Sequence, residues 1–403
     1  MKLLVVGHPF LFAYNQKKYV AMKQLDPRLR IRLVVPNCGR ERFELANYQV
    51  HAALTPEEVV PLRSRLSGWH MTYFHNPARL AAVLRDFQPD VVHIEEEPQA
   101  LITVETIRLQ RAVSRGAAVT LFSWDNLLRH RRFLQGALKR ELRRYSLGRV
   151  EAMVCGNQRA AELLRAEGRF KGIVEVLPQY GLDVTEHLPG TEPGLRAELG
   201  LENGTVVGHI GRLVPEKGLL LLLEALSRLR SYPWKLLLVG AGPLENEIRQ
   251  RWTAEFPGRI VFVPAVPYEQ VPRYLRCLDI FVLASYATRA WKEQFGLALA
   301  QAMMLGIASI GSTSGAIPEV LGAGGLLFEE LSSEGLARAL EELLASEERR
   351  QKLGALSRGI ALRKYTTEGV GAAYLSVFER ARNASAEPVM QASDLESTAS
   401  RKV

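Results

Sequence analysis

Short apolar runs alternate with longer stretches of helical periodicity along almost the whole chain. Runs of a few Val, Ile and Leu residues are typical of buried strands, whereas apolar residues spaced three and four apart are typical of helices packed on a sheet. Strands that alternate with helices predict βαβ units and parallel sheets. The pattern predicts strands near residues 3–6, 31–35, 90–94, 118–122, 152–155, 174–177, 205–210, 235–239, 260–263, 280–283, 308–310 and 326–328.

A break in this alternation divides the chain into two halves. Residues 183–204 are rich in Gly, Pro, Glu and Thr and have no strand pattern, so we interpret them as a linker. We therefore expect an α/β protein with two Rossmann-like, doubly wound domains, 1–182 and 205–365, that face each other across a cleft. Residues 366–384 predict a helix that packs back across both domains, and the polar residues 385–403 predict a disordered tail.

Two glycine-containing turns in the second half each join a predicted strand to a predicted helix. Residues 211–218 read Gly-Arg-Leu-Val-Pro-Glu-Lys-Gly, and residues 239–245 read Val-Gly-Ala-Gly-Pro-Leu-Glu. Such turns point a helix N-terminus at a ligand, which favours anions. Arg212 can bind phosphate oxygens with its planar fork, and Lys217 adds a compact positive charge. An ordinary solvent-facing turn with two basic residues fits the same pattern.

A third cluster follows the predicted strand at 280–283. We predict a helix over 294–305, with Glu293 at its start and free N–H groups near 295–297 that can receive phosphate oxygens. A carboxylate at this place can hold sugar hydroxyls. Gln301 lies about 80° further round a helix of ~3.6 residues per turn, so we expect it to face the same ligand. The alternative interpretation of Glu293 is a carboxylate that the helix dipole stabilises.

Three consecutive carboxylates, Glu95, Glu96 and Glu97, follow the predicted strand at 90–94. At the carboxyl end of a strand they are expected to face the cleft, where they could bind acceptor hydroxyls or act as a base. Consecutive side chains point in different directions, so we do not expect them to form a metal site. A solvated loop is the alternative interpretation of the same residues.

Taken together and in this order, the runs resemble the family-4 retaining glycosyltransferases, which have the two-domain GT-B fold. The first half resembles the family more loosely, through residues 89–98 and 177–183. The ordered combination carries the resemblance, whereas a single run would not. The matching runs are Gly-Arg-x4-Lys-Gly at 211–218, Val-Gly-x-Gly-Pro-Leu-Glu at 239–245, Val-Pro-Ala-Val-Pro at 263–267, Trp-Lys-Glu-Gln-Phe-Gly-Leu at 291–297 and Gly-Ala-Ile-Pro-Glu-Val at 315–320.

The resemblance implies a role for each matching residue. Arg212 and Lys217 resemble the pair that binds the donor diphosphate and stabilises the departing nucleotide. Glu293 resembles the first Glu of the family's Glu-x7-Glu motif, which contacts the donor sugar. Further donor contacts are implied for Gly211, Gly240, Val266, Gln294, Phe295, Gly296, Leu297 and Gln301. In the N-terminal, acceptor-binding domain we predict acceptor contacts from His8, Glu95, Glu96, Trp124 and Asn126.

The chain departs from the family pattern at three places. Gln301 stands where the family has its second Glu, which holds ribose hydroxyls, and an amide lacks the charge-assisted strength of a carboxylate. His8 lies in a Gly-His-Pro-Phe run where the family often has a glycine-rich loop. After the strand at 118–122 the family often has a His that touches the donor sugar. Asp125 or Asn126 is expected to replace it here, and we assign Asp125 a catalytic role.

The chain has 403 residues, of which 47% are apolar and 24% charged, with a formal charge of +9. Residues 128–149 hold eight Lys or Arg and one Glu, interleaved with apolar residues at helical spacing. This pattern is typical of a helix on an anionic membrane surface, and a solvated helix face fits it too. No nucleic-acid-binding module is visible.

Three widely spaced cysteines favour a reducing compartment and argue against a disulfide framework or a zinc site. No signal segment and no apolar run long enough to span a membrane is visible. We therefore expect a cytoplasmic protein that is either free or peripherally bound at the inner face of the membrane.

The resemblance implies retaining transfer from a nucleotide-diphosphate sugar to a glycan, lipid-linked or small-molecule acceptor, with no metal and no cofactor besides the sugar nucleotide. Two alternatives stay open. A nucleotide-sugar epimerase of the same fold would convert the donor without an acceptor. A non-catalytic nucleotide-sugar-binding protein would bind the donor without turnover. The sequence indicates neither the sugar nor the base, uridine or guanosine.

Overall fold

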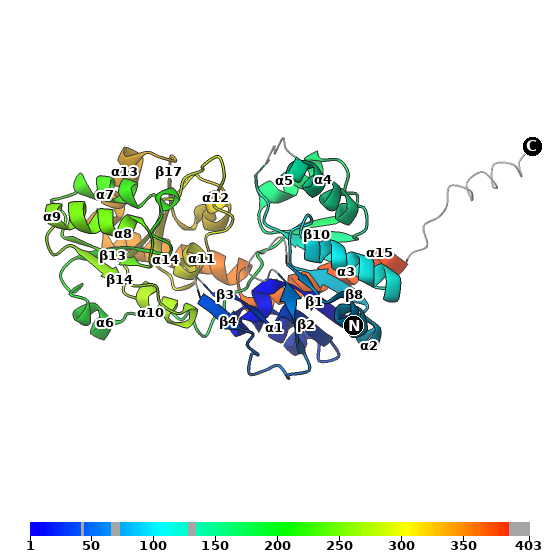
Figure 1. Cartoon of the computed structure of the whole chain (residues 1–403). Helices are drawn as coiled ribbons and strands as arrows, with labels where there is room; N and C mark the ends of the chain where they lie inside the picture. The colour runs from blue at the N-terminus through cyan, green and yellow to red at the C-terminus, as the bar shows by residue number, and fades with distance from the viewer. Residues whose placement is uncertain (42–43, 66–72, 128–133, 387–403) are drawn as a thin grey trace, which may run out of the picture.

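A computed structural model of the chain describes residues 1–41, 44–65, 73–127 and 134–386 and contains two parallel sheets, each covered by helices on both faces (Figure 1). The first sheet has the strand order β11 (Ile173–Val176), β10 (Ala152–Cys155), β9 (Ala118–Ser123), β8 (Val91–Ile94), β1 (Lys2–Val6), β2 (Arg30–Pro36) and β5 (Val59–Leu62). The second has the order β14 (Ile260–Val263), β13 (Trp234–Val239), β12 (Thr205–Ile210), β15 (Ile280–Leu283), β16 (Ala308–Ser312) and β17 (Leu326–Phe328).

All the strands predicted from the sequence are present, and their ends differ from the predicted ones by at most two residues. The edge strand β5 was missed, because it is only four residues long and contains Pro61, which is tolerated at an edge. Two short antiparallel pairs were also missed. They are β3 (Cys38–Glu41) with β4 (Glu44–Asn47) and β6 (Ser64–Arg65) with β7 (Phe74–His75).

The alternation of side chains along each strand divides the core of the first sheet between its two faces. Leu4 and Val6 of β1 face one core, with α2 (Pro77–Phe87), α3 (Leu101–Val113) and α5 (Gln158–Ala166). Leu3 and Val5 face the other core, with α1 (Lys17–Leu25) and α15 (Thr367–Ala386). Both faces of β1 are therefore buried from residue 3 to residue 6, which explains why these four residues are all apolar.

The second sheet is built in the same way. One face packs against α7 (Leu219–Ser227) and α13 (Ser333–Ala345), and the other against α10, α11 and α14. The remaining helical segments of the described chain complete the two layers. The bounds are η1 (His8–Leu11), η2 (Ala13–Gln16), α4 (Leu134–Leu147), α6 (Pro193–Glu198), η3 (Pro215–Lys217), α8 (Leu244–Glu247), η4 (Ile248–Trp252), α9 (Thr253–Glu255), η5 (Tyr268–Gln270), α10 (Val271–Leu275), α11 (Leu297–Met304), α12 (Ile317–Leu321), η6 (Gly322–Gly324) and α14 (Glu347–Lys364).

The chain returns to the first sheet at its C-terminal end. Leu182 and Thr366 form a parallel bridge, in which the Leu182 N–H donates to Tyr365 O over 2.7 Å. Gly181 is needed beside it, because a Cβ there would lie 2.3 Å from Thr367 Cα. From this crossing α15, red in Figure 1, runs among the elements of the first sheet, and its buried side chains belong to that sheet's core.

Three expectations about segments need correction or fall outside the structure. The predicted linker 183–204 contains α6 and packs on the second sheet, because Leu195 and Leu201 are buried in that core. The tail from 387 onward and residues 128–133 of the basic run lie outside the described residues. Within the described residues, no helix combines the length and apolar character that crossing a membrane requires.

Candidate functional site

The turn after β12 and the loop before α11 meet at the carboxyl edge of the second sheet. They meet because β12 pairs directly with β15, the strand that precedes the loop. The Lys217 ammonium donates to Glu293 Oε2 over 2.6 Å, and the Ser285 hydroxyl donates to the same oxygen over 2.9 Å. The Lys217 side chain is 14% exposed and that of Glu293 8%. Two residues that the sequence singled out separately thus form one partly buried ion pair.

The glycines of this region permit very close backbone packing. Gly240 has φ +148°, and a Cβ there would lie 1.8 Å from Gly211 O. Gly218 has φ +70° at the start of α7, and a Cβ there would lie 2.0 Å from Ala284 O. Only glycine combines these conformations with such approach. The glycines therefore hold the turn that carries Arg212 and Lys217 against the strand ends.

Arg212 and Lys217 are presented differently. The Arg212 side chain is 61% exposed, and its guanidinium lies 3.6 Å from the Glu216 carboxylate, a loose contact at the surface. Lys217 Nζ, besides its bond to Glu293, lies 4.8 Å from the ring centre of Trp291. A ligand at the turn would meet one exposed cation, Arg212, and one cation that is already positioned, Lys217.

The helix α11 begins at Leu297, three residues later than predicted, because Gly296 adopts a left-handed conformation with φ +86°. No side chain caps this N-terminus, so its first N–H groups keep their capacity to bind an anion. Glu293 precedes the helix by four residues and is bound by Lys217. The Lys217 pairing thus gives Glu293 a cationic partner in addition to the helix dipole that the alternative interpretation invoked.

The loop at Glu293 is also held by the first sheet. The Asn126 amide donates to Glu293 O over 3.0 Å, and Asn157 donates to Gln294 O over 3.0 Å. In return the Gln294 amide donates to Trp124 O over 3.2 Å. Asn126 and Trp124 follow β9 and Asn157 follows β10, so the carboxyl edges of the two sheets meet at this loop.

Two family profiles match the chain. The profile described as "Glycosyl transferase 4-like domain" matches residues 21–180, and the one described as "Glycosyl transferases group 1" matches residues 193–359. The chain belongs to the family-4-type glycosyltransferases. Its two-sheet architecture is the GT-B fold of this family.

The chain is similar to curated proteins over about half of its length. It is 30% identical over 200 residues to spore coat protein SA of Bacillus subtilis, which covers 47% of this chain and 52% of that protein. It is 30% identical over 212 residues to D-inositol 3-phosphate glycosyltransferase of Nocardia farcinica, with 49% and 45% covered. The chain thus spans about half the length of the curated relatives it matches.

Solved structures share the fold over nearly the whole chain. The HepE protein of Anabaena, crystallised with UDP, superposes with a TM-score of 0.70 at 17% identity and covers 94% of this chain and 100% of that one. Sucrose-phosphate synthase of Thermosynechococcus elongatus superposes with a TM-score of 0.69 at 15% identity, covering 95% and 100%. At these identities the likeness concerns the fold alone.

Gln301 is a buried residue of α11. Its side chain is 2% exposed, and its Nε2 lies 3.3 Å from His187 Nε2. The expectation that Gln301 faces the donor is wrong, because the segment after the crossing at Leu182 covers that side of α11. Val266 is partly buried and packs against the same core.

The side chains of the three consecutive carboxylates lie in different surroundings, as expected for consecutive residues whose side chains point in different directions. Glu95 is fully enclosed, where Lys18 Nζ and the Tyr19 hydroxyl donate to its Oε1. Burial alone would raise the pKa of Glu95, but the Lys18 charge lowers it to about 2, so the carboxylate is ionised. The expectation that Glu95 binds an acceptor is therefore wrong. Lys18 also lies 3.8 Å from the ring centre of Tyr374, which ties α15 to this cluster.

Glu96 is 6% exposed and accepts hydrogen bonds from the Tyr73 hydroxyl, over 2.8 Å, and from the His8 backbone N–H, over 2.9 Å. The His8 ring also contacts the Glu96 carboxylate, and its side chain stays 32% exposed. Of the two predicted acceptor-binding residues, His8 is therefore the more accessible, and the Glu96 carboxylate holds the backbone and ring of His8 in place.

Glu97, the third carboxylate, organises the loop after β9. It accepts from the Ser123 hydroxyl over 2.6 Å and from the Trp124 N–H over 2.8 Å. Burial, and next the Asp125 charge, raise the pKa of Glu97 to about 7. Asp125 is half-buried, and its N–H donates to Ser123 Oγ over 3.2 Å. Sequence reasoning did not assign Glu97 a site role, although its place in the acidic run was a usable signal.

His209, on β12, was also missed. It is 1% exposed, and its Nε2 has no hydrogen-bond partner among the described residues. Burial, and next the Lys217 charge, lower the pKa of His209 to about 4, so the ring is neutral. A Cβ on Gly211 would lie 3.2 Å from this nitrogen, which places the imidazole directly beneath the turn. A single His inside an apolar strand gives no sequence signal for that position.

No group of three or more His, Cys, Asp or Glu residues that could hold a metal ion occurs in the part of the chain that the structure describes. Cys155 and Cys277 are buried free thiols. The arrangement is thus a cationic turn, a paired carboxylate and an uncapped helix N-terminus on one sheet, with an amide-rich loop from the other sheet against them.

Proposed function

We propose that this chain transfers a glycosyl group, with retention of configuration, from a nucleoside-diphosphate sugar to an acceptor hydroxyl, without a metal ion or other cofactor. The observation that carries the proposal is the contact between Lys217 and Glu293 beside the N-terminus of α11. A diphosphate needs cations and N–H donors, and a sugar needs a fixed carboxylate. The two requirements are met within one turn and one loop.

The donor diphosphate would lie between the turn 211–218 and the start of α11. Lys217, the exposed guanidinium of Arg212 and the α11 N–H groups would neutralise the charge that grows as the C1–oxygen bond to the diphosphate breaks. The Glu293 carboxylate, fixed by Lys217 and Ser285, would accept hydrogen bonds from donor-sugar hydroxyls. Preorganised groups of this kind need no rearrangement at the moment of reaction.

The acceptor would approach from the first sheet. Its hydroxyl oxygen would attack C1 on the face that the diphosphate leaves, and its proton would pass to a diphosphate oxygen. His8 and Trp124 are the accessible predicted acceptor contacts on this side. Asn126 would position the Glu293 loop instead, because its amide donates to Glu293 O. The contacts between the sheets would exclude water from the donor.

The names of relatives support a nucleotide-sugar donor and a range of acceptors. They include a GDP-mannose-dependent monoacylated alpha-(1-6)-phosphatidylinositol monomannoside mannosyltransferase of Corynebacterium glutamicum and a 2-deoxystreptamine glucosyltransferase of Streptomyces kanamyceticus. The fold is shared with a protein crystallised with UDP. We therefore propose a glycan, lipid-linked or small-molecule acceptor and leave the base open between uridine and guanosine.

The test is product analysis with a panel of UDP- and GDP-sugars, with and without pooled glycan, inositol-lipid and aminocyclitol acceptors. We expect acceptor-dependent release of nucleoside diphosphate, a glycosylated product of retained anomeric configuration, and no loss of activity in a chelator. Conversion of the sugar nucleotide without an acceptor would instead identify an epimerase. Binding of the nucleotide without any turnover across the panel would identify a non-catalytic binding protein.

A further inference from the structure

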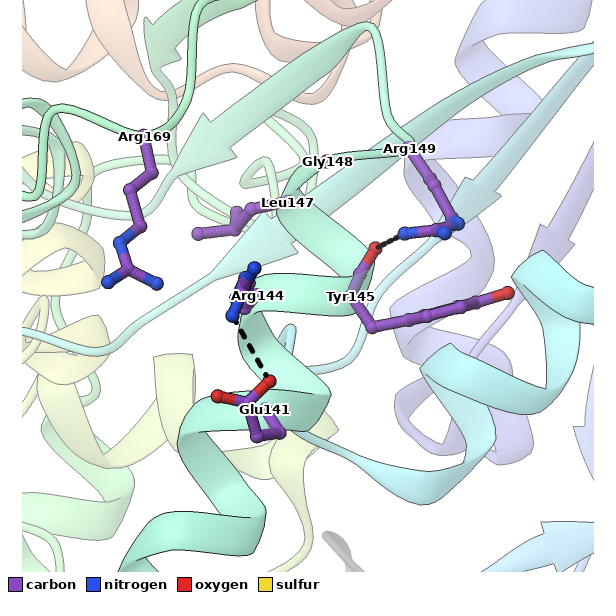
Figure 2. Close-up of a pocket in the computed structure, with 7 residues that line it drawn as sticks. All are labelled: Glu141, Arg144, Tyr145, Leu147, Gly148, Arg149 and Arg169. Atoms are coloured by element: carbon purple, nitrogen blue, oxygen red, sulfur yellow. Dashed lines mark hydrogen bonds and ion pairs between the residues drawn. The ribbon is translucent and has the colours of Figure 1, made fainter.

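Three arginines line a cavity at the C-terminal end of α4. The cavity has a volume of about 700 Å³, and Arg144, Arg149 and Arg169 line it together with a single acidic residue, Glu141 (Figure 2). We name this cavity the α4 pocket. Three guanidinium groups that share one cavity with one carboxylate leave a net positive charge, which an anion would compensate.

The α4 pocket lies at the amino edge of the first sheet, away from the proposed donor site. Arg149 precedes β10 and Arg169 precedes β11, whereas Asn126 and Asn157 follow β9 and β10 at the opposite, carboxyl edge. The length of a four-residue strand, at ~3.3 Å per residue, separates the two edges. The pocket is therefore independent of the residues proposed for sugar transfer.

The three arginines differ in how firmly they are held. Arg149 is fixed, because its guanidinium donates to Tyr145 O over 3.1 Å and stacks 3.9 Å from the Tyr145 ring centre. Arg144 is 65% exposed and lies 3.6 Å from Glu141. Arg169 forms no hydrogen bond or ion pair with any residue in the described chain. The guanidinium of Arg149 is thus held in place, and those of Arg144 and Arg169 remain available for a ligand.

The C-terminal end of a helix attracts cations by itself, so arginines near Leu147 need no ligand to explain them. Two observations go further. Arg169 comes from the loop after α5 and not from α4, yet it lines the same pocket. A second cavity of about 430 Å³ shares Arg149 as a lining residue, and it is also lined by Arg111, Arg115 and one carboxylate, Glu151. The positive charge therefore continues along the amino edge beyond one helix end.

We propose that the α4 pocket binds the phosphate group of an anionic lipid headgroup at a membrane surface. The guanidinium fork matches phosphate oxygens, and basic clusters on amphipathic helices are attracted to anionic bilayers. The apolar surface near the arginines favours a lipid over free phosphate as the source of the phosphate group. Leu138, on the same helix, is 60% exposed, and Tyr145 and Leu147 contribute apolar walls.

The experiment is co-sedimentation of the full chain with vesicles of phosphatidylcholine mixed with phosphatidylglycerol, and with vesicles of phosphatidylcholine alone. The test variant is Arg144→Ala/Arg169→Ala, and the charge-matched control is Arg228→Ala/Arg338→Ala. Both control arginines are exposed and have an acidic partner one turn away on the second sheet's helices. We expect the test variant to weaken binding to the anionic vesicles on the order of tenfold. The control should change it less than twofold.

A further variant, Arg144→Lys/Arg169→Lys, keeps the charge and removes the forks, and we expect it to bind with intermediate strength. Equal weakening in the test and control variants would overturn the proposal, because it would show attraction by net charge alone. Full binding by the test variant would overturn it as well. Inorganic phosphate is the second probe, by calorimetric titration. Saturable phosphate binding that the test variant loses, in a native chain that does not bind vesicles, would overturn the lipid assignment in favour of a free anion.

Discussion

The ammonium of Lys217 and the carboxylate of Glu293 lie 2.6 Å apart, although 76 positions separate them along the chain. Their elements are adjacent because β12 and β15 pair at the centre of the second sheet. The pair is only slightly exposed, so its Coulomb attraction is less screened than that of a surface ion pair. It couples the residue proposed for the diphosphate to the residue proposed for the sugar.

Replacement of Lys217 by Ala is predicted to lower kcat/KM for the matched donor and acceptor by roughly 10²–10³-fold, the usual effect of removing one preorganised charge. Glu293→Gln should lower it as well. The two losses should not add in the double variant, because each single change already breaks the same pair. Initial rates of nucleoside-diphosphate release measure this. Fully additive losses would show that the two residues act independently.

Asn126→Ala is predicted to lower the rate while leaving the fold intact. The change removes a buried hydrogen bond of 3.0 Å that joins the loop after β9 to Glu293 O. We expect about a tenfold loss in kcat, corresponding to ~1.4 kcal/mol, with a smaller change in the thermal midpoint. The exposed Asn203→Ala serves as the control. An unchanged kcat would mean that this bridge between the sheets does not position Glu293.

Gly240→Ala tests the packing beneath the turn. Its φ of +148° and the 1.8 Å separation between a Cβ and Gly211 O require the backbone to move. We expect a loss of at least ~3 kcal/mol in the free energy of unfolding by urea. Gly258→Ala is the matched control, since Gly258 also has a positive φ, +68°, but open space around its Cβ. That variant should lose only ~1 kcal/mol. Similar losses in both would refute the role of close packing.

Glu97→Gln is predicted to change how stability depends on pH. The pKa of Glu97 is raised in the folded chain from 4.5 to about 7, so the folded state binds the proton more tightly than the unfolded state. The stabilisation of the folded chain by protonated Glu97 is therefore complete below about pH 4.5, and it is lost as the pH rises through about 7. At ~1.36 kcal/mol per pKa unit, its upper bound is roughly 3 kcal/mol. Partial solvent exposure of Glu97 reduces that value.

The measurement is urea unfolding of the native chain and of Glu97→Gln at pH 5 and pH 8. The native chain should lose free energy of unfolding relative to the variant between these values. Other titrating groups, such as Glu105, whose pKa burial raises to about 7, contribute to both proteins and cancel in the comparison. A constant difference between the two proteins across this range would contradict the assignment.

The fold followed closely from the sequence because the central strands of both sheets are short apolar runs that are buried on both sides. In β1, Leu3 and Leu4 face different cores, so both positions need an apolar side chain. The edge strand β5 and the short antiparallel pairs could not be read in this way. Their residues bury little and include Pro61, so their pairing depends on neighbouring strands and not on local pattern.

The candidate site was predictable where backbone chemistry dictates it and not where tertiary contacts do. The Gly211 and Gly240 turns need glycine for close approach, and the sequence shows this directly. The left-handed Gly296 shortened α11, and the contact of His187 with Gln301 enclosed a residue expected to face the donor. Lys18, which forms a buried ion pair with Glu95, lies far from it along the chain. No local pattern reports such partners.

The most direct test of the central claim is calorimetric titration of UDP and GDP into the native chain, Arg212→Ala and Lys217→Ala. We expect the native chain to bind at least one of the two diphosphates. Each variant should bind it at least tenfold more weakly, while its thermal midpoint without nucleotide stays nearly unchanged. Binding of the same strength in all three proteins would show that the diphosphate lies away from the turn after β12.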